Sequence, residues 1–401
     1  MALAPVEVNS RMKITLHRVF GVALLLASLL ISLPVQAQED DSGDSDEGWG
    51  KLIAEYGTWI TEPRGLGNNV ATVQDPTNIF NDTVIGFRHG TTNEDYSRVG
   101  AELAGNRGRL LLTWYAHDSL GQMALRDPGN FIYGELLALP LFAGLSNDGL
   151  ADALDAVFVA ALRDQKIEYS RVAFSNSRVE GRWNAGLRQV TFRQSSDATY
   201  HALVPSFPAF LPPLVTSLPN LNPIADRAFM SSSYEGSGLS GGFEIEAPLY
   251  RKLLIEASFG LSILAGTVDT SYAGTNSLYT LGGFVLEAPY TELDDYTIDL
   301  SGNLSGTALS VQQVVVGAGL QSHSVSRNTQ ILEASIGGRW EAMKFMDVFF
   351  GFRTISYGNV AVELRPRNVT VIGNTANVVD ASETDRSATY EGFYGGIGFR
   401  F

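Results

Sequence analysis

Charged side chains recur at alternate positions within several apolar segments of this chain. Glu244 and Glu246 stand between apolar neighbours, and Glu256 repeats the pattern a few residues later. Alternate residues of a strand point to opposite faces, so one face of such a segment is charged and the other is apolar. Charges of both signs on an inner face could line a water-filled channel, or they could pair across strands and close it. The candidate pore-lining residues with this placement are Arg98, Glu102, Glu180, Arg182, Glu244, Glu246, Glu256, Glu333, Arg339, Asp347, Arg353 and Arg400.

The apolar faces of these segments are long enough to cross a membrane. Residues 253–265 place leucine, isoleucine, phenylalanine and alanine on one face and mostly small or polar residues on the other. A transmembrane strand needs about 9–11 residues. Residues 239–247 and 332–340 repeat the pattern, and each is followed by a short turn. This alternation is typical of a barrel with a lipid-facing outside and a polar inside.

Short and long connections between the expected strands alternate along the chain. Further strands are expected at 50–60, 94–104, 108–117, 166–183 and 185–196. Short turns are expected near 105–107, 184, 248–250 and 342–344, and long loops at 61–93, 118–165, 197–230, 269–326 and 361–386. Bacterial barrels have short periplasmic turns and longer external loops. The sequence therefore predicts an all-β protein, a transmembrane antiparallel β-barrel of about 10–12 strands with both termini in the periplasm.

Two of the expected loops have a distinctive composition. Residues 205–223 hold six of the 15 prolines, which predicts a stiff external lid or a constriction folded into the lumen. In the loop 118–165, apolar residues at helical spacing predict a short surface helix over the barrel mouth, with a lumen plug as the alternative. These residues are Leu150, Leu154, Val157, Ala161 and Leu162.

Residues 1–37 have the layout of a cleavable secretory signal peptide. A basic segment precedes an apolar run from Val19 to Leu33, and Val35-Gln36-Ala37 forms a small-x-small cleavage site. The run is shorter than the roughly 20 residues of a spanning helix, although a retained anchor is the alternative. Residues 38–48 form an acidic linker, and 49–401 are expected to form the barrel. We expect export to the outer membrane of a Gram-negative cell.

The composition and the available motifs disfavour several classes of function. Acidic residues outnumber basic ones by 43 to 28, which argues against a nucleic-acid partner. The chain has no cysteine, and it shows no motif for a metal or a cofactor. His117-Asp118, at the expected external end of a strand, resembles a hydrolase dyad, but no nucleophile motif accompanies it. We therefore expect no enzymatic activity and no catalytic residues.

Two short motifs are expected to lie at the periplasmic side. Tyr394, Gly396, Phe399 and Phe401 have the spacing of a C-terminal motif that resembles the recognition signal of outer-membrane barrels for their assembly machinery. The tripeptide Gly-Arg-Trp occurs at 181–183 and 338–340. Each copy is expected to close a strand just before a turn, with its arginine inward and its tryptophan outward at the membrane interface.

Four stretches of the C-terminal half resemble the Legionella-type pore-forming major outer-membrane-protein family. They are residues 179–188, 234–238 running into 253–269, 332–340 and 390–401. The resemblance implies a porin-like barrel that conducts small solutes. A non-conducting structural or adhesive barrel is the alternative, and an outer-membrane hydrolase is a remote one. The expected partners are outer-membrane lipid, the barrel assembly machinery and periplasmic chaperones during export, with a homo-oligomer as a further option.

Overall fold

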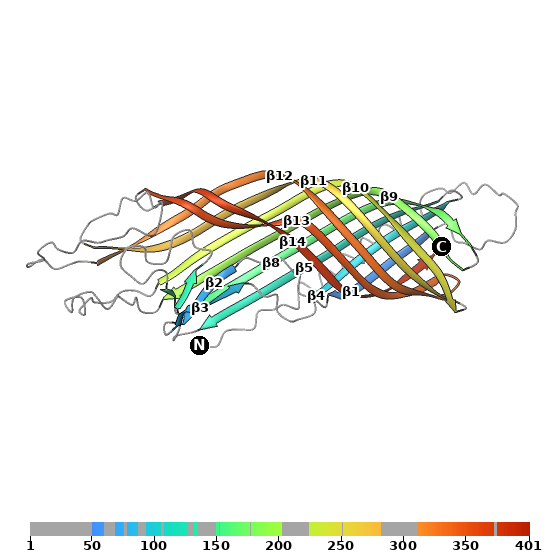
Figure 1. The fold of residues 1–401 in the computed structure, drawn as a ribbon, viewed down its shortest axis with the longest axis horizontal. Helices are drawn as coiled ribbons and strands as arrows, with labels where there is room; N and C mark the ends of the chain where they lie inside the picture. Colours follow the sequence, from blue (N-terminus) through green and yellow to red (C-terminus); the bar gives the residue numbers. More distant parts are fainter. Residues whose placement is uncertain are drawn as a thin grey trace, which may run out of the picture.

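The chain folds into one closed antiparallel β-barrel, shown in Figure 1. The structure, a computed structural model, describes residues 50–59, 69–75, 78–86, 94–105, 108–126, 131–134, 150–151, 153–176, 178–202, 224–250, 252–281, 311–372 and 375–401. Within these ranges, ten strands close the barrel in the order β1-β14-β13-β12-β11-β10-β9-β8-β5-β4. None of the described residues forms a helix that is long and apolar enough to cross a membrane.

The barrel strands are longer in the C-terminal half than in the N-terminal half. They are β1 (Gly50–Trp59), β4 (Glu94–Gly105), β5 (Gly108–Arg126), β8 (Ala153–Ser175), β9 (Glu180–Ala202), β10 (Ile224–Tyr250), β11 (Leu253–Leu281), β12 (Val311–Met343), β13 (Met346–Ile372) and β14 (Thr375–Arg400). A separate small sheet has the order β3-β2-β6-β7. It consists of β2 (Asn69–Asp75), β3 (Asn78–Gly86), β6 (Phe131–Gly134) and β7 (Leu150–Ala151). The predicted fold class and strand number are confirmed.

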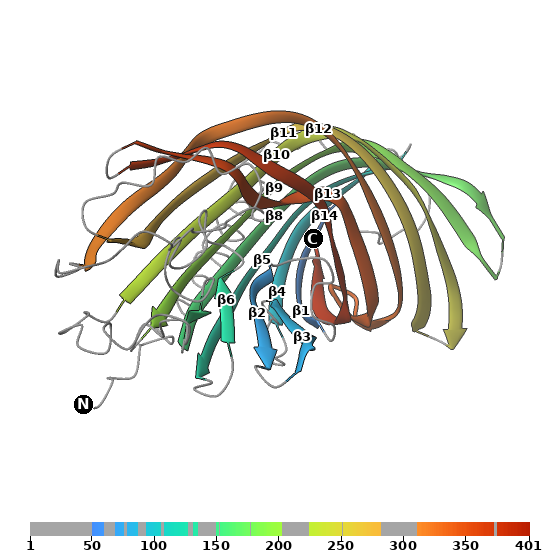
Figure 2. The same cartoon turned by 60° about the vertical axis from the view of Figure 1, so that its left-hand side comes forward.

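The two ends of the barrel differ in the length of their connections. Residues 106–107, 176–179, 251–252 and 344–345 join strands at one end, which we call the turn end. The first and last strands also meet there. The backbone N–H of Gly50 donates to Phe401 at 3.2 Å, and the N–H of Phe401 donates back at 3.0 Å. The opposite end, which carries longer connections except between β13 and β14, is called the loop end (Figures 1 and 2).

An exposed apolar belt surrounds the part of the barrel nearest the turn end. Leu239 on β10, Phe259 on β11, Ile336 on β12 and Phe393 on β14 all point outward and are more than half exposed. Water-soluble proteins rarely expose so large an apolar surface, whereas the lipid-facing wall of a membrane barrel is built this way. The belt and the closed ladder together make this chain a transmembrane barrel, since closure leaves no unpaired strand edge in lipid.

One of the two Gly-Arg-Trp tripeptides lies where the sequence predicted, and the other does not. Trp340 closes β12 just before a turn, but residues 181–183 begin β9 instead of ending a strand. The turn falls at 176–179, where the side chain of Asn176 accepts hydrogen bonds from the backbone N–H groups of Arg178 and Val179 at 2.8 and 2.9 Å. Asparagine favours turns through such contacts. This local preference explains why the turn lies at 176–179 and not near residue 184, where it was predicted.

Strands extend far into segments that were expected to be loops. Much of 118–165 belongs to β5 and β8, and the outer parts of 197–230, 269–326 and 361–386 belong to β9 through β14. The prediction was wrong about these bounds because an apolar outer face marks only the part of a strand in lipid. Backbone pairing continues beyond the belt, where the outer face is polar. The expected signal peptide at 1–37, the linker at 38–48 and the proline-rich segment 205–223 lie outside the described residues.

The helix predicted from the apolar residues between 150 and 162 is instead part of β7 and β8. Leu154, Phe158 and Leu162 are fully buried on the inner face of β8. Their spacing of four residues fits a helical turn, but it is also an even number and so fits one face of a strand. Val157, by contrast, points outward and is exposed. Pairing with β5 and β9 on both sides decides in favour of the strand.

The belt predicts a position-dependent effect of charge on folding. Phe259→Arg, in the middle of the apolar face of β11, should lower the free energy of unfolding in lipid vesicles by about 2–4 kcal/mol, because a cation is moved into hydrocarbon. Thr267→Arg, on the same outer face of the same strand but beyond the belt, should lower it by at most about 1 kcal/mol. Urea titration followed by tryptophan fluorescence measures both. Equal losses would mean that Phe259 does not face lipid.

Candidate functional site

All the charged positions predicted from the sequence lie on the inner face of the barrel. The strand register places Arg98, Glu102, Glu180, Arg182, Glu244, Glu246, Glu256, Glu333, Arg339, Asp347, Arg353 and Arg400 on that face. The prediction of their orientation needed only the two-residue period of a strand. Most of them fall into two groups at different depths. One surrounds a cavity at the turn end, and the other takes part in a layer at mid-height.

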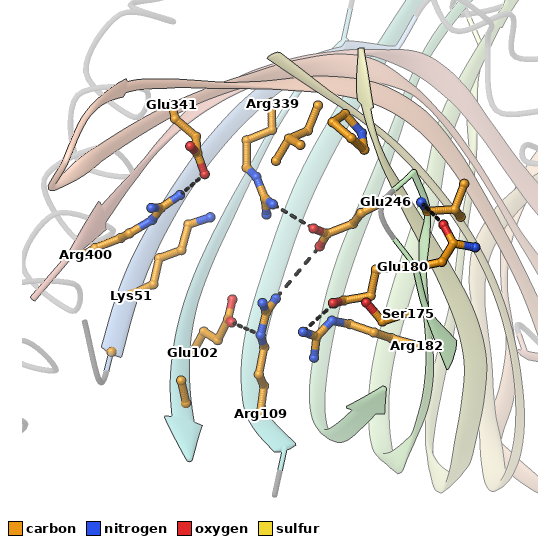
Figure 3. Close-up of a pocket in the computed structure, with 16 residues that line it drawn as sticks. Lys51, Glu102, Arg109, Ser175, Glu180, Arg182, Glu246, Arg339, Glu341 and Arg400 are labelled. Carbon is orange, nitrogen blue, oxygen red and sulfur yellow. Dashed lines mark hydrogen bonds and ion pairs between the residues drawn. The ribbon is translucent and has the colours of Figure 1, made fainter. Parts of the chain in front are cut away.

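The turn-end group lines a cavity of about 320 Å³, which we call the vestibule (Figure 3). Its wall is a chain of ion pairs that runs from strand to strand. Arg109 contacts Glu102 at 3.1 Å and reaches Glu246 at 3.8 Å, and Arg339 donates to Glu246 at 2.7 Å. Arg339 also contacts Glu256 at 2.8 Å. Most of these charges remain partly exposed, so the vestibule is a polar space that water can enter.

A second set of pairs fixes the closing seam of the barrel beside the vestibule. Asp347 on β13 is fully buried and contacts Lys51 on β1 at 2.8 Å and Arg400 on β14 at 2.7 Å. Arg400 also contacts Glu341 on β12 at 3.0 Å. Four neighbouring strands are therefore tied together by side chains where the first strand meets the last. These contacts supplement the backbone ladder at the seam.

The mid-height layer is centred on a buried carboxylate of β1. Glu55 accepts hydrogen bonds from the hydroxyl of Tyr96 at 3.0 Å and from Arg98 at 3.1 Å. Arg353 of β13 also donates to both of its oxygens. Glu55 and Arg353 are each about 5% exposed or less, so their charges are balanced within the barrel. Arg353 in turn lies over the ring of Tyr394, 4.6 Å from its centroid.

From Arg353 the network continues across the lumen to the far wall. Glu333 on β12 lies 3.7 Å from Arg353, 3.5 Å from Arg188 on β9 and 3.5 Å from Lys166 on β8. Tyr357 on β13 donates to Asp164 on β8 at 2.8 Å. Four strands separate β13 from β8 around the barrel, so this hydrogen bond spans the interior. We call the connected residues the ionic layer: Glu55, Arg98, Asp164, Lys166, Glu168, Arg188, Glu333 and Arg353.

A layer of rings packs on the loop-end side of the ionic layer. Trp59 stacks on Tyr96 with ring centroids 4.4 Å apart, and it contacts Tyr390 at 5.4 Å. Tyr390 of β14 also meets His117 of β5 at 5.1 Å, although β1 and β4 lie between these two strands. Buried aliphatic and aromatic residues of β8 to β11 complete this layer, among them Phe192. The described side chains therefore fill the barrel from the ionic layer toward the loop end.

The sequence prediction missed five of the eight residues of the ionic layer. Glu55, Asp164, Lys166, Glu168 and Arg188 were not among the candidate residues. Asp164 falls in a segment that was expected to be a loop, so the wrong strand boundary hid it. Arg188 is even-numbered like Arg182 on the same strand, and extending that alternation would have found it.

His117 and Asp118 do not form the dyad that the sequence suggested. β5 continues to Arg126, so these neighbours lie within a strand and point to opposite faces. His117 is buried among aromatic rings, and its Nδ1 lies 3.1 Å from the backbone oxygen of Asp95. Asp118 is exposed on the outer wall, where Arg163 donates to it at 2.9 Å. Within the described part of the chain, no group of three or more acidic, histidine or cysteine residues could hold a metal ion.

The predicted C-terminal motif lies in the wall as expected from its alternation. Tyr394 and Gly396 face the lumen, and Phe399 faces outward and is exposed. The inner surface at Gly396 is occupied by the ring of Phe349, which comes within 2.4 Å of the position a Cβ would take, so a larger residue would not fit there. Recognition of this strand by an assembly machinery remains a prediction.

No protein-family model and no curated protein matches the sequence. Solved structures of outer-membrane proteins match most of the chain at low similarity. The outer membrane protease OmpT from Escherichia coli is 9% identical, with 88% of this chain and 94% of that chain covered and a TM-score of 0.38. The toluene transporter TodX from P. putida is 8% identical, with 89% of this chain and 91% of that chain covered and a TM-score of 0.29. The translocator domain of the autotransporter NalP from Neisseria meningitidis is 9% identical, with coverages of 95% and 97% and a TM-score of 0.18. At such similarity these matches carry no functional argument, so function must be inferred from contacts within the chain itself.

The ionic layer predicts that loss of one buried charge is far more damaging than loss of an exposed one. Arg353→Ala should lower the free energy of unfolding by about 3–5 kcal/mol, because Glu55 and Glu333 lose a buried cation. Arg227→Ala removes an exposed partner of Asp197 on the outer wall and should change it by at most about 1 kcal/mol. Urea titration in the same vesicles compares them. A loss for Arg353→Ala as small as that for Arg227→Ala would contradict the layer.

Proposed function

We propose that this chain is a porin-like outer-membrane barrel whose lumen is closed at rest and opens for the passive passage of ions or small solutes. The observation that carries the proposal is the ionic layer. It joins opposite walls of the barrel through single side chains, and it faces a charged vestibule that water can enter. A barrier of side chains can rearrange without unfolding any strand. Charges on the approach to it would set ion preference.

The cellular setting belongs to the same proposal. Export through the signal peptide at 1–37 would deliver the chain to the periplasm of a Gram-negative cell, where chaperones and the barrel assembly machinery would act on it. The turn end would then face the periplasm and the loop end the outside, as in bacterial barrels with short turns and long loops. The resemblance to the Legionella-type pore-forming family is in line with passage of solutes. The absence of enzymatic activity stays a prediction.

The aromatic layer favours a second candidate, a non-conducting structural or adhesive barrel. About eight strands leave an interior that side chains can fill, and this barrel has only ten. Rings packed against one another on top of an ion-pair network are what a permanently filled interior would contain. The two candidates differ in one measurable respect, which is whether loosening the ionic layer produces conductance.

A planar-bilayer experiment separates the two candidates. The unaltered protein should show at most rare and brief openings, because the ionic layer spans the lumen. The double variant Arg188→Ser with Asp164→Ser removes a buried pair together, so it leaves no partnerless charge of that pair behind while it widens the middle of the lumen. We expect stable single-channel steps from this variant, at least about tenfold more frequent than in the unaltered protein.

The matched control removes an arginine–aspartate pair from the outer wall. Arg227→Ser with Asp197→Ser should leave the conductance of the unaltered protein unchanged, because this pair lies outside the lumen. Stable large steps from the unaltered protein would disprove closure at rest. An ion-tight bilayer with the lumen variant at high protein load would disprove the pore and leave the structural barrel.

A further inference from the structure

Glu244 differs from the other inward charges that the sequence predicted, because no partner neutralises it. It makes no hydrogen bond and no ion pair with another described residue, whereas each of the other predicted positions contacts a charge of opposite sign. Glu244 is half-buried on the inner face of β10, where Arg182 of β9 lies opposite it in the ladder. Arg182 contacts Glu180 at 2.5 Å instead.

Glu244 lies between the vestibule and the ionic layer. Two residues nearer the turn end on the same face of β10, Glu246 lines the vestibule. In the other direction, Ser240 donates to Glu168 of the ionic layer at 3.2 Å. The neighbouring wall is open at Gly260 of β11, where a Cβ would find its nearest atom outside the adjoining residues at 3.8 Å. A solute that moves from the vestibule toward the ionic layer therefore passes Glu244.

The basic residues of the turn end do not balance the acids of the β10–β11 hairpin. Four bases are each matched by one acid, and the pairs are Arg109 with Glu102, Arg182 with Glu180, Lys51 with Asp347, and Arg400 with Glu341. Arg339 contacts both Glu246 and Glu256, at 2.7 and 2.8 Å (Figure 3 shows Arg339 and Glu246). Glu246 and Glu256 lie directly opposite each other, where like charges repel. With Glu244, three carboxylates share one arginine, so the inner face has an excess of two negative charges at this depth.

A neutral acceptor beside Glu244 is also without a partner. Asn184 follows Arg182 on the inner face of β9, and its side chain lies over Gly242, the residue opposite it on β10. Its Oδ1 is buried and accepts no hydrogen bond from a described group. Carboxylate and amide oxygens are the groups that hard cations prefer. The surroundings of Glu244 therefore suit a cation better than an anion.

We propose that Glu244 determines the selectivity of the pore, and that the solutes which pass are hydrated inorganic cations such as potassium. The proposal rests on the pore proposed above and names the class of solute for it. A fixed negative charge on the approach to a constriction raises the local concentration of cations and lowers that of anions. No group of three or more acidic, histidine or cysteine residues in the described ranges could hold a metal ion, so the cation keeps its water and is bound weakly enough to leave.

Reversal potentials measure this selectivity in a planar bilayer. In a KCl gradient of about tenfold at about pH 8, where carboxylates are ionised, channels of the Arg188→Ser, Asp164→Ser variant should favour potassium over chloride by about fivefold. Adding Glu244→Gln should lower this ratio by at least about twofold, because the unpaired charge is gone. Adding Glu256→Gln as well should bring the ratio close to about one, since both excess charges are then removed.

The matched control is the same substitution on the other face of the same strand. Glu235 is exposed on the outer wall of β10, so Glu235→Gln should leave the ratio unchanged. Heat-modifiable migration on gels shows that each variant is folded. A preference for chloride, or a ratio that Glu244→Gln and Glu235→Gln change equally, would overturn the role of Glu244 even though the channel conducts.

A thiol reaction tests the same charge without any conductance. The chain has no cysteine of its own, so Leu254→Cys places a single thiol on the vestibule wall. At low salt, its ratio of reaction rates with a cationic and an anionic methanethiosulfonate should exceed that of a free thiol in solution. Glu244→Gln should lower this ratio about threefold, and Glu235→Gln should not change it.

The two measurements separate failure of the pore from failure of the selectivity position. If no variant conducts but the ratio of thiol rates falls with Glu244→Gln, the pore is refuted and Glu244 is supported as a charge that attracts cations. If Glu244→Gln leaves the ratio of thiol rates unchanged, the role of Glu244 is overturned, whether or not the lumen variant conducts.

Discussion

The structure depends on one constraint, that every backbone group of a chain within lipid must find a hydrogen-bond partner in the chain itself. The ladder closes where Gly50 of β1 and Phe401 of β14 exchange backbone hydrogen bonds. Closure with ten strands fixes the width of the lumen. The lumen is narrow enough for Tyr357 on β13 to donate a hydrogen bond to Asp164 on β8. The filled interior therefore follows from the strand number as much as from the residues that fill it.

The same constraint explains which parts of the structure could be predicted. Alternation between Phe259 and its polar neighbours reports which face meets lipid, so the orientation of the charged residues followed from the sequence. The spacing of Leu154, Phe158 and Leu162 is even and close to a helical turn, so it cannot separate a strand from a helix by itself. Asn176 determines a turn by a local contact that the apolar pattern does not contain. Asp164 was missed because pairing beyond the belt leaves no apolar face to detect.

The contacts across the lumen could not be predicted from the sequence at all. They join residues far apart in the chain, such as Glu55 with Arg353, and they depend on the order in which the barrel closes. Burying such charges is unfavourable unless each has several partners. Glu333 has such partners, since three cations surround its carboxylate. The network adds specificity as well as stability, because a slip of one residue in any strand would turn its charges to the lipid face.

The two ends of the lumen are closed by different physical means. At the turn end, partly exposed ion pairs surround a hydrated vestibule, and such pairs can exchange partners at low energetic cost because water replaces what is lost. At mid-height the charges are buried and each is held by several partners. On the loop-end side, backbone of β13 also lies in the interior, since Gln194 on the inner face of β9 donates to the carbonyl oxygen of the buried Val362 at 3.0 Å. A solute that entered from the vestibule would therefore meet exchangeable ion pairs first and the buried ionic layer next.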